Sequence, residues 1–554
     1  MKTPASAWVV PPAQPLLIRD LLTRVRHWAG GQKIIYRDLR EHSYTEFLAR
    51  VDRLGRVLTE LGVKAGDRVG VLDCDSHRYL ELFFAVPMLG AVLHTVNVRL
   101  TAEQIAYTIR HAADTLILVH TDFLPLAAEL APKVPDVRVW VAMTDAEIPM
   151  QSGVPLAGEY EALLAAAAPG FAFPDLDENT VATLFYTTGT TGEPKGVYFT
   201  HRQLVLHTLA VGLTFSAFRD PVSLHGGDVY MPLTPMFHVH AWGFPYLATM
   251  LGMTQVYAGR FEPALLLRLI TQHNVTVSHG VPTVLQMLLH HPASAGVDLS
   301  RLKLVVGGAP FPAGLARQAR ARGMQVMSSY GMSETCPVVA SAHCKPDLAS
   351  NDPEAQMEVS VRTGFPLPLV DAGIWSSTGT LLPPGRDQIG ELVLRAPWLT
   401  AGYHLDPARS AELWRGGWLH TGDIAYRDTD GYIRITDRLK DVIKIGGEWI
   451  SSLELESVLS RHEAVKEVAV VGVPHAKWDE RPHADVVLHA AFAGRVTPRE
   501  LLKFLHGFIE AGVIHQRAVL TEIRLVESIP RTSVGKIDKK ALRVALLATA
   551  ESAP

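Results

Sequence analysis

The stretch YTTGTTGEPKGV, Tyr186–Val197, contains three glycines, four threonines and one lysine within twelve residues. The preceding VATLFY is typical of a buried strand, and the following THRQLVLHTLAVGL is typical of a helix capped by Thr200 and Gln203. Glycines let a loop turn tightly and expose its N–H groups, while threonine hydroxyls and Lys195 add donors and a positive charge. The stretch therefore predicts a loop that wraps a polyphosphate. A surface loop built of turn residues is the alternative interpretation.

A Walker A loop does not fit this stretch. That loop needs serine or threonine directly after Gly-Lys, because the hydroxyl holds magnesium. Here Pro194 precedes Lys195 and Gly196 follows it. The sequence therefore excludes the P-loop NTPase class.

Outward from this loop, helical and strand patterns alternate over the first 430 or so residues. Short apolar runs such as DRVGVLD, VTVSHG and LKLVVGG are separated by amphipathic helical patterns such as YTEFLARVDRLGRVLTELG. The alternation predicts an α/β fold, a large N-terminal domain of layered mixed or parallel sheets with helices.

Beyond Asp423 the pattern changes to hairpins and isolated helices. An Asp-Gly turn separates two strand patterns, and helices begin after the caps Ser451 and Thr497. This indicates a small C-terminal α+β domain. We expect an N-terminal domain over 1–436, a hinge over 437–441 and a C-terminal domain over 442–554.

Composition narrows the class of protein. The 554 residues carry a net charge of −4 and no basic run, so nucleic acid is not an expected partner. Three cysteines cannot form a disulfide framework, and with no signal peptide pattern they favour the cytoplasm. The most apolar stretch, 80–96, contains Glu81 and Pro87 and is too short to span a bilayer, so it predicts a buried helix and strand rather than an integral membrane segment. A homodimer is expected only because homodimers are common among soluble enzymes.

Six motifs occur in a fixed order along the chain. They are the phosphate loop, GGAP (Gly307–Pro310), SSYGMSET (328–335), WLHTGDIAY (418–426), DRLKDVIKIGGEWISSLELE (437–456) and PRTSVGKIDKK (530–540). Together they resemble the adenylate-forming superfamily. The sequences of the motifs are most similar to those of medium-chain fatty acyl-CoA ligases and methylthiopropionate-CoA ligases.

The resemblance implies an ATP-dependent acid–CoA ligase of fatty acid metabolism that needs Mg²⁺. A carboxylic acid would form acyl-AMP with release of pyrophosphate, and the acyl group would then pass to coenzyme A, leaving AMP. Alternatives are an aryl or bulky polycyclic acid CoA ligase, an enzyme that loads a carrier protein, and a non-catalytic nucleotide-binding homologue. Glu334 and Lys536 are both present, which argues against the non-catalytic alternative.

The resemblance also implies catalytic roles. Lys536 would stabilise the charge that develops during adenylation, Glu334 and Thr188 would hold Mg²⁺, and His238 would gate the acyl site. Lys440 would be the hinge about which a mobile C-terminal domain rotates between the two steps. The alternative for each of these lysines is an ordinary solvated charge on the surface, with no catalytic role.

Binding roles follow from the same motifs. Tyr330 would stack on adenine, and Asp423 and Arg438 would contact the ribose or phosphates. The glycines of KIGGEW would let the pantetheine arm of coenzyme A pass close to the backbone. The full set expected to bind nucleotide or coenzyme A is Thr187, Thr188, Gly189, Thr190, Thr191, Gly192, Lys195, Gly308, Ala309, Pro310, Ser329, Tyr330, Gly331, Met332, Ser333, Asp423, Ile435, Arg438, Lys444, Gly446, Gly447 and Glu448.

The acyl pocket is expected around MPLTPMFHVHAWGFPY and HGVPTVLQML, with the lining residues His238, His240, Trp242, Gly243, Gly280, Val281 and Pro282. A metal site at the H-x-H pair is not favoured, because no third ligand is identifiable. His240 stands where the subfamily is expected to have asparagine. That difference points to a bulkier, polar or ring-bearing acid.

Overall fold

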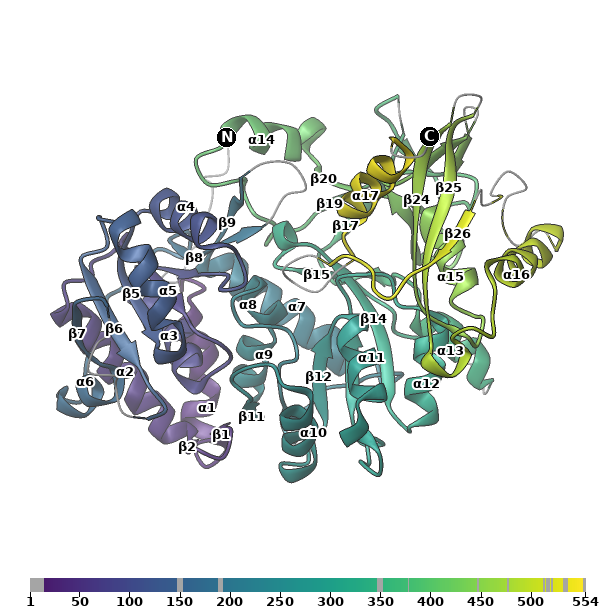
Figure 1. Ribbon diagram of the computed structural model, residues 1–554. Coiled ribbons are helices and arrows are strands. Elements are labelled where there is room, and N and C mark those ends of the chain that lie inside the picture. Colours follow the sequence, from purple (N-terminus) through teal and green to yellow (C-terminus); the bar gives the residue numbers. More distant parts are fainter. Residues whose placement is uncertain are drawn as a thin grey trace, which may run out of the picture.

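The computed structural model describes residues 14–146, 153–187, 193–345, 352–376, 378–445, 448–475, 478–511, 514, 519, 522–531 and 537–551 (Figure 1). Within these ranges the strands form four sheets. The helices that cover them are α1 (Thr23–Trp28), α2 (Tyr44–Glu60), α3 (His77–Met88), α4 (Ala102–Ala112), α5 (Leu124–Leu130), α6 (Tyr160–Ala166), α7 (His201–Ala217), α8 (Val239–Trp242), α9 (Phe244–Leu251), α10 (Pro263–Gln272), α11 (Pro282–His290), α12 (Ala313–Ala321), α13 (Pro353–Ser360), α14 (Pro407–Leu413), α15 (Ser452–Leu459), α16 (Pro498–Glu510) and α17 (Lys539–Glu551).

A seven-stranded sheet holds the phosphate-loop motif. Its order is β7-β6-β5-β3-β4-β8-β9, and neighbouring strands are parallel except for β8 and β9. The strands are β3 (Arg68–Leu72), β4 (Val92–Thr95), β5 (Asp114–His120), β6 (Val139–Met143), β7 (Leu156–Glu159), β8 (Val181–Thr187) and β9 (Lys195–Thr200).

A nine-stranded sheet lies beside it (Figure 1). Its order is β16-β15-β14-β13-β12-β10-β11-β1-β2, with a parallel centre and antiparallel edges. The strands are β1 (Lys33–Tyr36), β2 (Arg40–Ser43), β10 (Val229–Tyr230), β11 (Thr254–Tyr257), β12 (Val277–Gly280), β13 (Lys303–Val306), β14 (Gln325–Gly331), β15 (Val338–Ser341) and β16 (Phe365–Pro366).

Helix α3 shows how these layers are held together. Every residue from His77 to Met88 is buried, and the helix connects β3 to the parallel strand β4. Burying a large apolar side chain such as Phe83 or Phe84 contributes roughly 1.5–3 kcal/mol before entropy costs. The apolar stretch 80–96 is therefore a buried helix and strand, as predicted.

A third sheet is antiparallel, in the order β18-β17-β19-β20-β21. It consists of β17 (Asp371–Trp375), β18 (Leu381–Leu382), β19 (Gly390–Arg395), β20 (Leu419–Arg427) and β21 (Ile433–Arg438). The hairpin expected around the Asp-Gly turn is β20–β21. It belongs to this sheet rather than to the small C-terminal unit.

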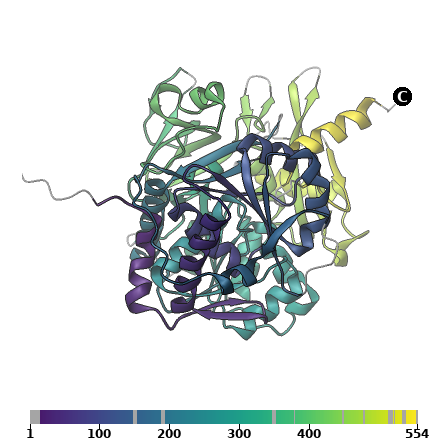
Figure 2. The same cartoon turned by 90° about the vertical axis from the view of Figure 1, so that its left-hand side faces the viewer.

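The fourth sheet contains the strands after the DRLKD segment, β22 (Ile443–Ile445), β23 (Glu448–Ile450), β24 (Val465–His475), β25 (Asp479–Leu488) and β26 (Glu522–Leu525). Helices α15, α16 and α17 accompany it, and Figure 2 shows α17 reaching outward at the edge of the molecule. Thr497 and Glu500 form the predicted capping box of α16. The α/β fold with a smaller C-terminal α+β unit is confirmed.

The fourth sheet contacts the larger part of the chain through α11 and the end of β21. The Gln286 side-chain amide donates to the Lys466 carbonyl oxygen at 2.6 Å, and the Ser452 N–H donates to Asp437 Oδ2 at 2.5 Å. The rings of His290 and His489 lie 5.4 Å apart. In the part of the chain that the structure describes, none of the helices is long and apolar enough to cross a bilayer.

Candidate active site

The phosphate-loop motif connects two strands rather than a strand and a helix. β8 pairs antiparallel with β9, with Thr187 opposite Lys195, and α7 begins only after β9. Thr200 and Gln203 form the capping box of α7, as predicted. The segment GVYFT before this helix forms most of the edge strand β9, which the sequence pattern did not predict. Thr188, Gly189, Thr190, Thr191 and Gly192 lie outside the described residues.

Three residues expected to bind nucleotide meet where the ends of β14 and β21 lie against the middle of β20. The Tyr330 hydroxyl donates to Asp423 Oδ2 at 2.6 Å, and Arg438 Nε lies 3.3 Å from Asp423 Oδ1. Asp423 and Arg438 are opposite each other in the β20–β21 ladder. Burial and the neighbouring carboxylate raise the pKa of Tyr330 well above its ordinary value, so its phenol remains a donor.

The carboxylate expected to hold magnesium lies one turn further along the chain. Glu334 is on the short 3-10 helix η5 (Ser333–Thr335) and is buried. The Tyr403 hydroxyl donates to Glu334 Oε1 at 2.7 Å, and the Tyr403 ring lies 4.6 Å from Lys195 Nζ. Two predicted phosphate-site groups, Lys195 and Glu334, are thereby joined through one tyrosine.

The GGAP turn follows β13 and lies against the strand of Tyr330. A Cβ at Gly307 would be 2.7 Å from the Ser329 carbonyl oxygen and 3.1 Å from the Trp242 ring. Gly308 has φ of +75°, a conformation that favours glycine. The turn therefore brings a nucleotide motif and the acyl-pocket segment into contact, which requires the glycine at 307.

The other residues of these motifs lie on β21, at the end of β14 and in the turns that follow β13 and β14. Ala309 and Pro310 continue the turn toward the surface, and Met332 and Ser333 lead from β14 into η5. Ile435, on β21, is half-buried, and its N–H donates to Thr363 Oγ1 at 3.0 Å. Gly331 is tightly confined, because a Cβ there would meet the Pro337 carbonyl oxygen at 1.9 Å.

The acyl-pocket segment contains an uncommon backbone. Residues 239–242, which form α8, all have positive φ, from +47° to +60°, and Gly243 follows at +75°. L-residues in this left-handed region cost roughly 1–2 kcal/mol each. Surrounding contacts must therefore hold the turn in place.

His240 points from this turn into an aromatic core. Its ring lies 5.3–6.4 Å from the rings of Phe83, Phe185, Phe199 and Tyr246, and it is fully buried. Neither ring nitrogen has a hydrogen-bond partner among the described residues. Burial lowers the pKa of His240 to about 3, so the imidazole is neutral at pH 7.

A cavity of about 510 Å³ lies beside His238. It includes Val281, at the start of α11, and it extends to Lys466, Glu467 and Arg531 of the C-terminal unit. Two predicted pocket residues, His238 and Val281, thus share one hollow. The other predicted pocket residues, His240, Trp242, Gly243, Gly280 and Pro282, lie outside the lining of this cavity.

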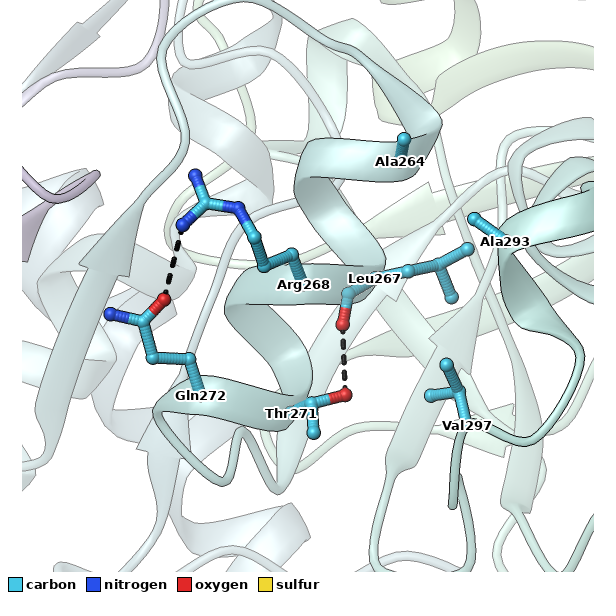
Figure 3. A pocket seen from close by; sticks show the side chains of 7 residues that line it. All are labelled: Ala264, Leu267, Arg268, Thr271, Gln272, Ala293 and Val297. Atoms are coloured by element: carbon cyan, nitrogen blue, oxygen red, sulfur yellow. Dashed lines mark hydrogen bonds between the residues drawn. The ribbon is translucent and has the colours of Figure 1, made fainter.

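A second hollow, of about 380 Å³, lies between α10 and the segment after α11 (Figure 3). Its lining includes Leu267, Arg268 and Val297, and none of the predicted site residues. In Figure 3 Arg268 bonds to Gln272 within α10 rather than pointing to a common centre. This hollow carries no catalytic arrangement.

The residues predicted for the C-terminal unit and its hinge lie partly within and partly outside the described ranges. Lys536, Gly446 and Gly447 lie outside the described residues, as does the side chain of Glu448. Lys440 and Lys444 are exposed, and the Lys444 N–H donates to Glu480 Oε2 at 2.8 Å. No contact joins Lys444 to Tyr330, Glu334 or Asp423 among the described residues.

Lys539, three residues after Lys536, lies in the described part of the chain. Its ammonium lies 2.7 Å from Glu456 Oε1 and donates to Ser452 Oγ at 2.6 Å. Only 11% of the side chain is exposed. Lys539 is therefore part of the packing between α17 and α15 rather than a solvated charge.

Tyr403 is the site residue that sequence reasoning missed. It lies 69 residues from Glu334, in a loop whose local pattern indicates only a turn. The β9 strand pairs with this loop at Val197–Tyr403. No spacing rule predicts that contact, because it depends on how separate sheets pack.

The residues present fit a magnesium–nucleotide complex. Among the described residues, Tyr403 alone hydrogen-bonds the Glu334 carboxylate, at Oε1, so Oε2 is left for a cation. Ser329 Oγ is buried with no hydrogen-bond partner in the described part of the chain. Buried polar atoms are normally satisfied, and a hard cation prefers carboxylate oxygen next to phosphate. No group of three histidine, cysteine or carboxylate side chains among these residues forms a separate metal site.

Comparison with known proteins agrees with this arrangement. The family of AMP-binding enzymes matches residues 23–404, and the AMP-binding enzyme C-terminal domain matches residues 454–536. The chain is 41% identical over 537 residues to a long-chain-fatty-acid–CoA ligase of Thermus thermophilus, covering 96% of this chain and 95% of that protein. It is 36% identical to a 3-methylmercaptopropionyl-CoA ligase of Ruegeria lacuscaerulensis, over 96% and 97% of the two chains.

A solved structure shares the same fold. The crystal structure of the anthranilate CoA ligase AuaEII in complex with anthranoyl-AMP superposes with a TM-score of 0.84 at 23% identity, covering 97% of this chain and 99% of that one. The first family match alone spans well over half of the 554 residues. The chain therefore belongs to the AMP-binding enzyme family.

Proposed function

We propose that the acid activated by this ATP-dependent acid–CoA ligase is a fatty acid or a comparably apolar acid. The protein couples a carboxylic acid to coenzyme A through acyl-AMP. One observation carries the assignment: side chains from four separate motifs form two adjoining groups of contacts. Tyr403 contacts both Lys195 and Glu334, and Asp423 contacts both Tyr330 and Arg438, with Tyr330 and Glu334 only four residues apart. The names of the relatives support an aliphatic acid, and the apolar walls of the cavity beside His238 are compatible with one.

In the first step, a carboxylate oxygen of the acid attacks the α-phosphorus of ATP. The bond from that phosphorus to the bridging oxygen breaks, and pyrophosphate leaves with the electron pair. A carboxylate is already a nucleophile, so no side chain must remove a proton. When bound, Mg²⁺ neutralises charge on the phosphate oxygens.

The residues of the chain then have electrostatic tasks. Glu334, with Thr188, holds the metal, and Lys195 and the loop amides bind the outer phosphates. Lys536 stabilises charge at the transferring oxygens. Asp423 binds and orients the ribose. The adenine then lies against the ring of Tyr330.

In the second step, the thiol of coenzyme A loses its proton to solvent and its sulfur attacks the acyl carbon. The bond from that carbon to the former carboxylate oxygen breaks, and AMP leaves with this oxygen and the electron pair. We propose that the unit over 442–554 rotates about 437–441, with Lys440 as the pivot, to present Lys444, Gly446, Gly447 and Glu448 to the pantetheine arm. The exposure of Lys440 and Lys444 supports this, because neither is fixed in the core.

Three finer points belong to the same proposal. His240 in place of asparagine does not alter this proposal, because its ring lies in the aromatic core and outside the lining of the cavity beside His238. An aryl acid or a carrier-protein thiol remains the alternative within the fold. We place the protein in the cytoplasm, as a homodimer, which the three free cysteines and the base rate for enzymes support.

The deciding experiment measures AMP and acyl-CoA from ATP, Mg²⁺, coenzyme A and a panel of acids. The panel runs from short and medium chains through methylthiopropionate and aryl acids to polycyclic acids. We expect a medium-chain or similar apolar acid to give equal amounts of AMP and thioester. AMP without thioester would contradict coenzyme A as the acceptor, and an aryl acid as the best substrate would contradict the proposed class.

The role of Lys536 is tested in the two half-reactions. Lys536→Ala should abolish most acyl-AMP formation but spare thioester formation from supplied acyl-AMP, because its charge serves only the first step. Lys539→Ala is the matched control and should affect stability instead, since Lys539 lies in the contact between α17 and α15. Equal loss of both half-reactions in Lys536→Ala would contradict the assignment.

A further inference from the structure

Tyr403 occupies the junction between the two charged groups expected at the phosphates. Its hydroxyl reaches Glu334 Oε1 at 2.7 Å, and its ring face lies 4.6 Å from Lys195 Nζ. Only 9% of the residue is exposed. One side chain therefore contacts both groups through two different chemical features.

The hydroxyl fixes one oxygen of the Glu334 carboxylate. A buried, charge-assisted hydrogen bond of this length selects one rotamer of Glu334 and directs Oε2 away from the tyrosine. A tyrosine phenol has an ordinary pKa of about 10 and is a donor at physiological pH, which fits its 2.7 Å bond to the carboxylate.

The ring places the lysine. An ammonium about 4.6 Å from an aromatic centroid is attracted to the electron-rich face. Lys195 sits at the first position of β9, opposite Thr187, so its backbone is already set by the hairpin. The ring then restricts where a flexible four-carbon side chain carries its charge.

Tyr403 is itself held from several directions. Its N–H donates to Ser410 Oγ at 2.8 Å, and the next residue, His404, donates from its N–H to the Gly196 carbonyl oxygen at 2.8 Å. The Thr400 N–H donates to the Glu334 carbonyl oxygen at 3.0 Å. The loop before α14 is therefore attached both to the phosphate hairpin and to the η5 turn, and Figure 1 shows α14 near β9.

We propose that Tyr403 is a positioning residue that couples the metal-binding carboxylate to the phosphate-binding lysine, so that each is preset for the magnesium complex of ATP. The inference rests on the proposed roles of Glu334 and Lys195. It assigns to the hydroxyl an effect on metal binding and to the ring an effect on nucleotide binding.

The test uses the full-length protein and a readout that needs no turnover. Mn²⁺ replaces Mg²⁺, and its dissociation constant is measured by electron paramagnetic resonance in the presence of ATP. Tyr403→Phe removes only the hydroxyl and should weaken Mn²⁺ binding about tenfold. Tyr403→Leu removes the ring as well and should also raise the dissociation constant for ATP, measured by calorimetry without an acid, roughly three- to tenfold.

Tyr198→Phe is the matched control, because Tyr198 lies on the same strand β9 and loses the same atom. It should change neither constant. The effect of Tyr403→Phe should also shrink in a Glu334→Gln background, since the hydroxyl acts through that carboxylate. Equal Mn²⁺ affinities for Tyr403→Phe and Tyr198→Phe would overturn the proposal.

A second pair of variants tests the proposal if Tyr403→Phe does not fold. If the phenylalanine variant does not fold, p-aminophenylalanine and p-methylphenylalanine at position 403 fill the space of the phenol with and without a donor. The amino variant should keep Mn²⁺ binding and the methyl variant should lose it; equal binding by both contradicts the proposal. Failure of every acid in the activity panel would instead contradict the proposed function, because Mn²⁺ binding is measured without an acid.

Discussion

At the scale of single residues, two glycines of the candidate site differ in what surrounds them. A Cβ at Gly331 would lie 1.9 Å from the Pro337 carbonyl oxygen and 2.6 Å from its carbonyl carbon. At Gly280 the nearest heavy atom to a Cβ would be 3.5 Å away, on Leu233, an ordinary contact distance. The glycine at 331 is therefore required by packing against backbone, and the one at 280 is not.

We predict that Gly331→Ala lowers the free energy of unfolding by at least roughly 1–3 kcal/mol, because the backbone around Pro337 must shift to admit a methyl group. Gly280→Ala is the matched control and should change it by less than about 1 kcal/mol. Denaturant unfolding of both variants measures the difference. Equal stability of the two variants would mean that the β14 edge yields more easily than its geometry indicates.

At the scale of elements, α8 is a left-handed turn of ordinary L-residues. Ala241 has φ of +47° and ψ of +47° and is fully buried. Ala248, in the right-handed helix α9 a few residues on, is equally buried. The two alanines therefore differ in backbone conformation and little in burial.

Substitution by glycine removes one methyl group at both positions, but its effect on the backbone free energy should have opposite signs at the two. Ala241→Gly relieves the left-handed penalty, whereas Ala248→Gly adds the entropy cost of glycine in a helix. We expect Ala248→Gly to be the less stable variant by about 2 kcal/mol. Thermal or denaturant unfolding would decide the matter, and identical losses would show that α8 is unstrained.

The β8–β9 hairpin also belongs to the scale of elements. Its strand β9 pairs with β8 from Lys195 to Thr200 and carries the lysine at its first position. A strand gives that lysine a fixed origin, which a free loop would not. Local patterning predicts the helix α7 but not the intervening strand, because edge strands depend on the neighbour that they pair with.

At the scale of the whole molecule, Lys440 lies in the turn that leads from β21 to the C-terminal sheet. The Asp441 N–H bonds to the Arg438 carbonyl oxygen at 2.8 Å, which makes Lys440 the third residue of that turn. Proline at this position restricts the residue before it and disfavours the turn. No described hydrogen bond is donated by the Lys440 N–H, so proline removes none of them.

If this segment is the hinge, Lys440→Pro should change the rates of the two half-reactions by different factors, differing by roughly tenfold, or about 1.4 kcal/mol. Lys440→Ala should alter both rates by similar factors. The measurements are acyl-AMP formation from ATP and acid, and thioester formation from supplied acyl-AMP. Parallel changes in the proline variant would argue against a rotation centred here.

Acid stability is also a property of the whole molecule. Burial lowers the pKa of His207, His240 and His279 to about 3, and that of His201 and His343 to about 4. The unfolded chain protonates these groups near pH 6.5, so between pH 6.5 and about 3 it binds more protons than the folded chain. Stability due to these histidines is therefore present above pH 6.5 and is lost as the pH falls.

We predict a steep fall in the unfolding temperature between pH 7.5 and pH 5, since each such histidine costs about 2 kcal/mol at pH 5. Asp75 acts in the opposite sense, because burial raises its pKa to about 7 and the folded chain binds its proton first. His240→Asn should reduce the number of protons that the chain takes up on unfolding near pH 5 by about one. An unfolding temperature that does not change over this range would contradict the buried, neutral state of these rings.

Much of the fold is determined by the sequence at short range. The α/β alternation, the buried helix and strand over 80–96, and the caps of α7 and α16 all follow from local periodicity and from side chains within one turn. The ordered motifs likewise predict the family, because each motif is a local pattern. These features need no knowledge of which segments later meet.

Other features were decided only by tertiary structure. The contact of Tyr403 with both Glu334 and Lys195 joins residues 69 and more positions apart, and the left-handed turn of α8 persists because packing around it outweighs its local cost. The second strand of the phosphate hairpin exists only because β8 lies beside it. Sequence by itself determined what each segment prefers and which chemistry it carries. Tertiary packing decided which groups meet, because contacts between distant segments depend on the placement of whole sheets rather than on spacing along the chain.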